Sequence, residues 1–250
     1  FSDRPDTKMS EGVIQSWKAK RRNLIFVGLF SVASAVMILA PLYFRRRTEG
    51  WRPPDLARNM IYFASLGAGF MLIEMGIIQK LRLLVGHPGY TLATVLAGIV
   101  FFAGIGSLAS GKLFNSGILT LRPAAFLALL TSVLCVIGFD ALSPVLLALP
   151  RVAKMALAFL LPAIPAFFMG QLYPQGLAIL PKVEGEIPLH MSVNAVTGTI
   201  AGGLGVTLAQ LAGYNGVIFI GAAFYFVAGM ISGPGPVTEP SRQAVMSEAH

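Results

Sequence analysis

Long apolar runs alternate with short polar clusters over most of this sequence. A helix needs about 20 apolar residues to cross a hydrocarbon core of about 30 Å, and seven runs approach that length. They predict membrane-spanning helices at about 23–44, 60–78, 90–114, 123–139, 152–180, 191–212 and 214–232. No strand-like alternation persists outside these runs. The sequence therefore predicts an all-α, polytopic integral membrane helix bundle of about seven transmembrane helices.

Two of the predicted spans are irregular in sequence. The fourth is uniformly apolar only as far as Phe139, so residues 140–150 are expected to form an interfacial or re-entrant piece. The fifth contains Pro162, Pro165 and Pro174. Each proline lacks a backbone donor and crowds the preceding turn. We therefore expect the fifth helix to be kinked or broken, with an irregular stretch before Pro174.

The predicted transmembrane domain covers residues 23–232. A polar N-terminal segment at 1–22 precedes it, and the polar residues 233–250 are expected to form a disordered tail. The last two spans are separated only by a short turn at Gly213. They should form an antiparallel hairpin.

Composition supports a protein embedded in a bilayer. Of the 250 residues, 55% are hydrophobic and only 12% are charged, whereas a soluble domain carries about 25% charged residues. The formal net charge is +8, but the basic residues lie in short clusters beside the apolar runs. That placement favours contact with anionic lipid headgroups over nucleic acid, which we do not expect as a partner. The single cysteine, Cys135, excludes an intrachain disulfide.

Small residues at a spacing of four predict where helices pack closely, because lipid tails provide no hydrophobic force between helices. Ala103, Ser107 and Gly111 form one such stripe in the third helix, and Gly198 with Gly202 forms another in the sixth. We expect both helices to be central in the bundle. The glycines could permit sliding or gating, but tight static packing is the interpretation we prefer.

Glu74 is the strongest single candidate for a functional group. It lies in the middle of an apolar run, where a carboxylate costs roughly 2.5 to 3.5 kcal/mol, so it should face the protein interior. We expect it within hydrogen-bonding reach of the polar residues in the fifth and sixth spans, of which Gln171, Tyr173 and Asn194 are the candidates. Two roles stay open for Glu74, a structural hydrogen-bonding hub and a site for a cation or proton.

Two further polar residues are candidates for the turn or the membrane interface. Gln79 follows Glu74 by five residues, lies on another face of the helix, and is expected near the interface. His87 lies in a Gly-His-Pro-Gly turn, where it could titrate or bind a metal, but a turn role is the preferred interpretation.

The sequence contains none of the patterns that usually mark a soluble active site. It has no glycine-rich phosphate loop, no Ser-His-Asp ordering, no cluster of His or Cys and no paired carboxylates. We therefore expect no catalytic residue, metal or cofactor in this chain alone.

Several segments nevertheless resemble one known family. Residues 62–111 contain GFMLIE, an Ile-Gln pair, the Gly-His-Pro turn and the ending GIGSLASG, and MGQLYPQGL follows at 169–177. A Ser-Val-Asn-Ala segment precedes the glycine-rich sixth span, and Ser-Asp-Arg-Pro occurs at 2–5. This set resembles the membrane portion of bacterial spermidine-synthase-like proteins. The chain departs from the family at 171–173, where Gln-Leu-Tyr replaces the usual Met-Pro-Phe.

The resemblance implies a multi-pass protein of the bacterial cytoplasmic membrane. Members of the family commonly join such helices to a Rossmann-like domain, resembling aminopropyltransferases or methyltransferases, that would bind S-adenosylmethionine or its decarboxylated form. The nucleotide-binding loop of that domain is not found in these 250 residues. The resemblance therefore implies architecture here, and no catalysis is carried over to this chain.

Three functions remain open at this point. The leading hypothesis is a non-catalytic membrane module that anchors a fused or associated synthase-like domain or serves as an accessory subunit among other membrane subunits. The second is a transporter or channel for a small, possibly cationic solute, which Glu74 and the proline-rich fifth span favour. The third is the membrane part of an S-adenosylmethionine-related transferase whose catalytic domain lies outside this sequence.

Overall fold

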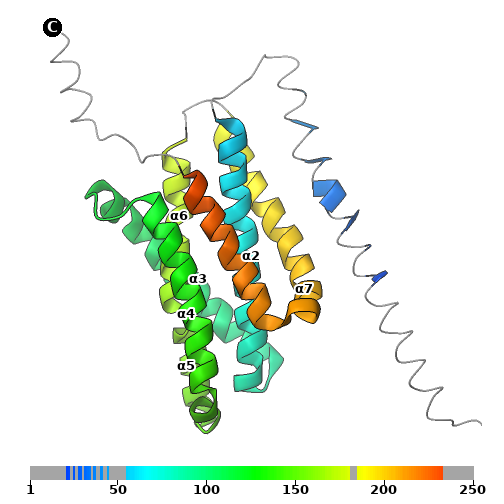
Figure 1. Ribbon diagram of the computed structural model, residues 1–250, viewed down its shortest axis with the longest axis vertical. Helices are drawn as coiled ribbons and strands as arrows, with labels where there is room; N and C mark the ends of the chain where they lie inside the picture. The colour runs from blue at the N-terminus through cyan, green and yellow to red at the C-terminus, as the bar shows by residue number, and fades with distance from the viewer. Residues whose placement is uncertain are drawn as a thin grey trace, which may run out of the picture.

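The protein is a bundle of long antiparallel helices. The computed structural model describes residues 55–180 and 185–232, together with separate helical positions between Arg21 and Phe44. Its labelled helices are α2 (Leu56–Val85), α3 (Pro88–Asn115), α4 (Leu121–Leu147), α5 (Arg151–Leu160), α6 (Ala163–Ala178) and α7 (Glu186–Ile231), as Figure 1 shows. Five helical stretches within the described residues are long and apolar enough to cross a membrane. The predicted all-α membrane bundle is confirmed.

Six labelled helices lie within residues 55–180 and 185–232, where the sequence predicted seven spans for the whole chain. The first predicted span, 23–44, is described only at separate positions, all of them helical, and the tail at 233–250 and all but the end of the segment 1–22 lie outside the described residues. The fifth predicted span is two helices, α5 and α6, and the last two spans form the single element α7. The split and the merger offset each other, so the difference in number comes from the first predicted span, which has no labelled helix.

The stretch 140–150 is not a separate interfacial piece, and that prediction is wrong. Helix α4 continues through Asp140 and Pro144 to Leu147. Pro144 cannot donate to the carbonyl of Asp140, one turn earlier, but the Ser143 hydroxyl donates to that carbonyl at 2.9 Å. The Asp140 carboxylate forms an ion pair with Lys80 at 2.6 Å. The carboxylate that interrupts the apolar run is thus paired with a cation of α2, and the carbonyl that Pro144 leaves free has a donor.

The predicted break in the fifth span is confirmed, but it lies at its first proline. Helix α5 ends at Leu160 and α6 begins at Ala163, on either side of Pro162. Pro165 falls in the first turn of α6, where a missing donor costs little. Pro174 lies inside α6, which is helical on both sides of it, so the irregular stretch expected there is wrong.

The predicted hairpin of the last two spans is confirmed at Gly213. This residue has φ 72° and ψ 173° inside α7, a conformation that a side chain would strain. It divides α7 into two arms, 186–212 and 214–231, which run antiparallel beside α2 in Figure 1. The first arm begins at Glu186, five residues before the predicted start of the sixth span.

Helix α2 is the centre of the bundle. In its most apolar stretch 72% of residues are buried, against 22% in α3, so the expectation that α3 is central is wrong. Three glycines of α2 bring it against both arms of α7. A Cβ on Gly67 would overlap the carbonyl oxygen of Asn194 in the first arm, and one on Gly76 would overlap Ile218 in the second. A Cβ on the third glycine, Gly69, would lie 3.0 Å from the carbonyl oxygen of Gly221 in the second arm.

One of the two predicted small-residue stripes packs as expected. Gly198 and Gly202 lie against Met71 of α2. A Cβ on either glycine would lie 3.2 Å from the Met71 side chain. The predicted stripe in the first arm of α7 is therefore confirmed.

The stripe predicted in α3 is wrong except for Ala103. Ser107 is exposed, and a Cβ on Gly111 would meet nothing within 4 Å among the described residues. Instead Gly106 packs against the backbone carbonyl of Phe167, and the backbone carbonyl of Ala103 packs against Gly170 of α6. Helix α3 has small residues on more than one face, because Gly106 lies next to Ser107 and Ser110 lies next to Gly111. The spacing of small residues alone therefore did not identify the face that packs against α6.

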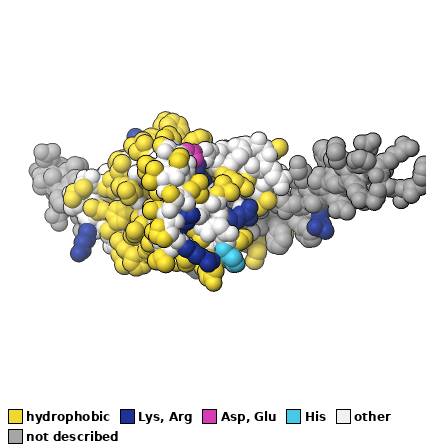
Figure 2. All heavy atoms as spheres, turned by 90° about the horizontal axis from the view of Figure 1, so that it is seen from below, with side chains coloured by type: hydrophobic (Ala, Val, Ile, Leu, Met, Phe, Trp, Pro, Cys, Tyr) yellow, Lys and Arg dark blue, Asp and Glu magenta, His cyan; other side chains and the backbone are white. Residues whose placement is uncertain are grey.

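The outer surface fits a lipid environment. Large apolar side chains are exposed on α3, α4 and α5, among them Leu108, Val145 and Val152. Figure 2, which views the bundle from its lower end in Figure 1, shows apolar side chains over much of the outline and basic side chains on the end face. Among the exposed basic residues at that end are Arg82 and Arg151. This distribution matches helices that span a bilayer and end in its headgroup region.

Two glycines of α3 provide a matched test of this packing. Gly106→Ala should destabilise the folded protein by about 1–3 kcal/mol, because the added methyl group overlaps the backbone of α6. Gly111→Ala should be neutral or stabilise by up to about 1 kcal/mol, because the position is open and alanine favours a helix. Unfolding of the purified variants in detergent measures both. Equal effects of the two substitutions would contradict the assigned contact face.

Candidate functional site

Two of the predicted polar residues line one cavity of the bundle. Tyr173 of α6 and Asn194 of α7 lie on the wall of a cavity of about 330 Å³ between α2, α6 and α7. Gly67, Gly170 and Gly198 line it as well. The cavity offers an amide and a phenol in mostly apolar surroundings. It can hold a small uncharged or weakly polar group.

Glu74 and Gln171 are buried but are not among the residues that line this cavity. Glu74 is 7% exposed, so its predicted interior position is confirmed. Within the described residues no hydrogen bond joins it to Gln171, Tyr173 or Asn194. Gln171 is fully buried, and both its amide atoms lack a hydrogen-bond partner there. The structure thus brings together Tyr173 and Asn194 and leaves the other two candidates separate from them.

His87 and Gln79 lie toward the end of the bundle where α2 turns into α3. His87 caps α3: its Nδ1 accepts from the Tyr90 amide at 3.5 Å, and its carbonyl accepts from the Thr91 hydroxyl at 2.8 Å. The ring is exposed, which agrees with the turn role predicted for it. Gly86, with φ 80°, ends α2 directly before it. Gln79 is half-buried near the same end.

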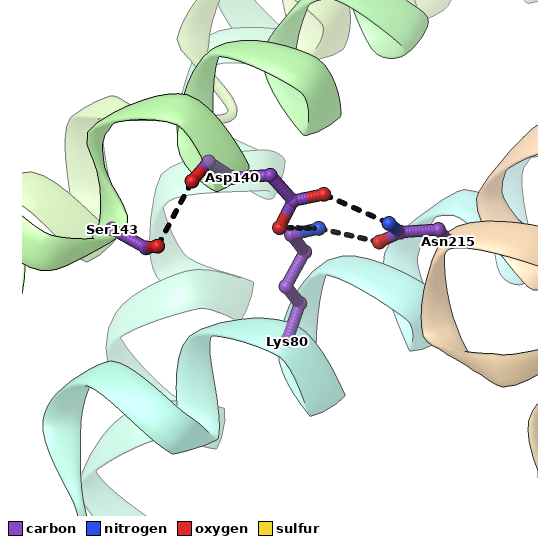
Figure 3. A network of polar contacts seen from close by, with 4 residues as sticks. All are labelled: Lys80, Asp140, Ser143 and Asn215. Carbon is purple, nitrogen blue, oxygen red and sulfur yellow. Dashed lines mark hydrogen bonds and ion pairs between the residues drawn. The ribbon is translucent and has the colours of Figure 1, made fainter.

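A network that the sequence did not predict joins three helices. Lys80 of α2 forms an ion pair with Asp140 of α4 at 2.6 Å and donates to the side-chain oxygen of Asn215 in the second arm of α7. Asn215 in turn donates to the other carboxylate oxygen of Asp140 at 2.8 Å. Figure 3 shows the three side chains converging from three separate helices. Each pair is bonded, so the network forms a closed ring.

Burial differs strongly between the two charged members. The Lys80 side chain is 8% exposed and lies over the Phe139 ring at 5.4 Å, whereas the Asp140 side chain is 50% exposed. The ammonium is therefore held in an apolar environment by a carboxylate that reaches solvent or headgroups. Both charges border a cavity of about 500 Å³.

The sequence hid this network because its members are distant along the chain. Lys80 resembled a residue that ends a span, and Asp140 resembled the start of an interfacial piece. One signal was available in the sequence. Lys80 and Asp140 each follow the C-terminal end of an apolar run, 60–78 and 123–139, within about one turn.

A second buried polar group lies at the opposite end of the bundle, where α2 and α7 begin. Glu186 and His190, one turn apart in α7, are both fully buried. Asn59 donates from its side chain to Glu186 Oε1 at 3.5 Å, and the His190 ring lies 5.2 Å from that of Phe63. The sequence prediction missed the pair because it placed the start of this helix after His190.

Comparison with known protein families, with curated proteins and with solved structures finds no match to this chain. The interpretation of its function therefore depends on the geometry described above. No group of three or more His, Cys, Asp or Glu side chains gathers anywhere in the described residues.

The Lys80 network can be tested with a double substitution. Asp140→Leu leaves the buried ammonium unpaired and should cost about 1–3 kcal/mol of stability, less than a fully buried pair because Asp140 is half exposed. Adding Lys80→Met removes the unpaired charge and should restore most of that loss. Arg58→Met, which breaks the exposed pair with Asp55, is the control and should cost under about 1 kcal/mol. A double variant less stable than Asp140→Leu alone would contradict the network.

Proposed function

We propose that this chain is a rigid, non-catalytic membrane module that anchors a fused or associated soluble domain, or serves as an accessory subunit of a membrane complex. The observation that carries the proposal is the burial of α2 between the two arms of α7 through glycine contacts. Contacts that leave no room for a methyl group allow few alternative arrangements of the helices. Such a bundle suits a module that fixes a position in the bilayer.

The Lys80 network supports the same proposal. It ties α2 to α4 and to the second arm of α7 near one end of the bundle. The glycine contacts hold α2 to both arms further along the helices. Relative movement of these helices would have to break backbone packing and an ion pair together.

The resemblance of residues 62–111 to spermidine-synthase-like membrane portions favours the bacterial cytoplasmic membrane as the location and a synthase-like domain as the partner. Under this proposal the chain holds the partner domain at the membrane, and the partner domain carries out any aminopropyl or methyl transfer.

A transporter of a small solute is the second candidate, and the cavity lined by Tyr173 and Asn194 favours it. Polar groups near the middle of a bundle are typical of transporter binding sites. The wall of this cavity contains no charged side chain, which fits a neutral solute better than a cation.

Reconstitution separates the two candidates. In proteoliposomes the rigid module should give no saturable solute uptake above empty vesicles. A soluble reporter fused ahead of residue 1 should stay with the membrane through an alkaline wash. Saturable uptake that is lost in Asn194→Leu, while the variant still folds, would replace the module with a transporter.

Glu74→Gln refines this comparison. It keeps a hydrogen-bonding group of similar size, so folding and reporter retention should be nearly unchanged if Glu74 is structural. Loss of a pH-dependent uptake in this variant would instead assign proton or cation transfer to Glu74.

A further inference from the structure

The cavity between α2, α6 and α7 brings together three side chains whose polar groups have no hydrogen-bond partner among the described residues. They are Tyr173 of α6, Asn194 of the first arm of α7 and Tyr225 of the second arm. Tyr225 is only 1% exposed, and a buried polar group without a partner costs free energy. A ligand that forms hydrogen bonds with these groups is therefore favoured.

The rest of the cavity wall suits a flat ring. Phe70 and Met71 of α2 and Met169 of α6 line it beside the rings of the two tyrosines. Aromatic side chains pack well on other rings, and thioethers make favourable contacts with ring edges. The volume of about 330 Å³ falls in the range of about 300–1,000 Å³ that is typical of small-molecule sites.

The cavity opens on the outer surface of the bundle at membrane depth. Ala195 and Thr199, at its rim, are exposed. Asn194 lies about 12 Å along α7 from Glu186, in an arm that is about 40 Å long. A hydrocarbon core of about 30 Å covers all but the ends of such an arm, so Asn194 falls within the core. A ligand that enters here comes through lipid and must be uncharged.

The chemistry of the wall narrows the class of ligand further. No charged side chain lines the cavity, so a polyamine or a nucleotide would find no counter-charge. A lipid acyl chain would fill the space but leave the amide and the two hydroxyls unpaired, which is unfavourable. A ring that carries carbonyl oxygens satisfies all three groups, because hydroxyls and amides donate hydrogen bonds to carbonyls.

We propose that this cavity binds the head ring of a membrane quinone, with Tyr173, Asn194 and Tyr225 donating to its carbonyl oxygens. The isoprenoid tail leaves past Ala195 and Thr199 into the lipid. The proposal concerns binding and includes no electron transfer. It does not depend on the anchoring function, and it requires no movement of the helices.

Binding to the full chain in quinone-free lipid nanodiscs tests the site. The probes are a ubiquinone with a single isoprenoid unit and an analogue of the same size whose ring lacks both carbonyl oxygens. The quinone should raise the Tm of the protein saturably, and the analogue should not. No rise with the quinone would overturn the proposal. An equal rise with the analogue would overturn it too, because the cavity would then accept any apolar molecule.

Three substitutions each remove one donor and keep the size of the side chain. Tyr173→Phe, Asn194→Leu and Tyr225→Phe should each weaken quinone binding about tenfold, as expected for the loss of one hydrogen bond. Tyr90→Phe is the matched control, because it removes an exposed hydroxyl at the start of α3, and it should bind as the unchanged protein does. Full binding in all three site variants, or an equal loss in the control, would contradict the assigned donors.

A photoreactive quinone gives a readout that does not require any variant to fold. An azido-benzoquinone should label the unchanged protein within residues 66–71, 169–173 or 194–199, and an excess of the short-chain ubiquinone should prevent the labelling. Labelling confined to other segments would overturn the site. Reporter retention and solute uptake are measured separately, so a failure of quinone binding would leave the anchoring proposal standing.

Discussion

The contact of α2 with both arms of α7 is the constraint on which the bundle depends. Membrane helices gain little from burying apolar surface against each other, so they need close van der Waals contact. Here the contact comes from glycines of α2: Gly67 lets the backbone of the first arm approach, and Gly76 makes room for the Ile218 side chain of the second arm. The turn at Gly213 returns the chain so that both arms reach the same helix.

The buried charge of Lys80 is placed where this packing allows it to be paired. Lys80 is buried, yet it meets Asp140 and Asn215 from two other helices, so its charge is compensated. The pairing also explains why α4 continues beyond Phe139. A carboxylate inside an apolar helix is tolerated once a partner helix supplies a cation at the same depth. The buried carboxylate of Glu74 has no ion-pair partner in the described residues.

The sequence predicted the class of fold and most of the helices, because apolar run length is a local property. It also predicted a break in the fifth span, though not its position at Pro162, and the hairpin at Gly213, since proline and glycine change the backbone locally. It could not predict which face of α3 packs, because small residues occur on several faces and only the partner helix decides between Gly106 and Gly111.

The candidate site was predicted less well than the fold. Tyr173 and Asn194 were candidates because they are polar residues within predicted spans, and they line one cavity. The Lys80 network and the Glu186 pair depend instead on how distant segments meet and on where α7 begins. Residues at the ends of a predicted span look like ordinary flanking residues until the helix start is known. Sequence patterns therefore found the polar residues in the middle of spans and missed those near the ends.

The central claim, that α2 is clamped between the arms of α7, is tested most directly by distances between spin labels in lipid nanodiscs. With Cys135 replaced by alanine, labels are attached at exposed positions, Leu83 of α2 with Leu211 of the first arm, and Ile61 of α2 with Met230 of the second. A clamped helix predicts one narrow distance distribution for each pair, unchanged by pH or by added solute. Two populations that exchange with conditions would contradict the account.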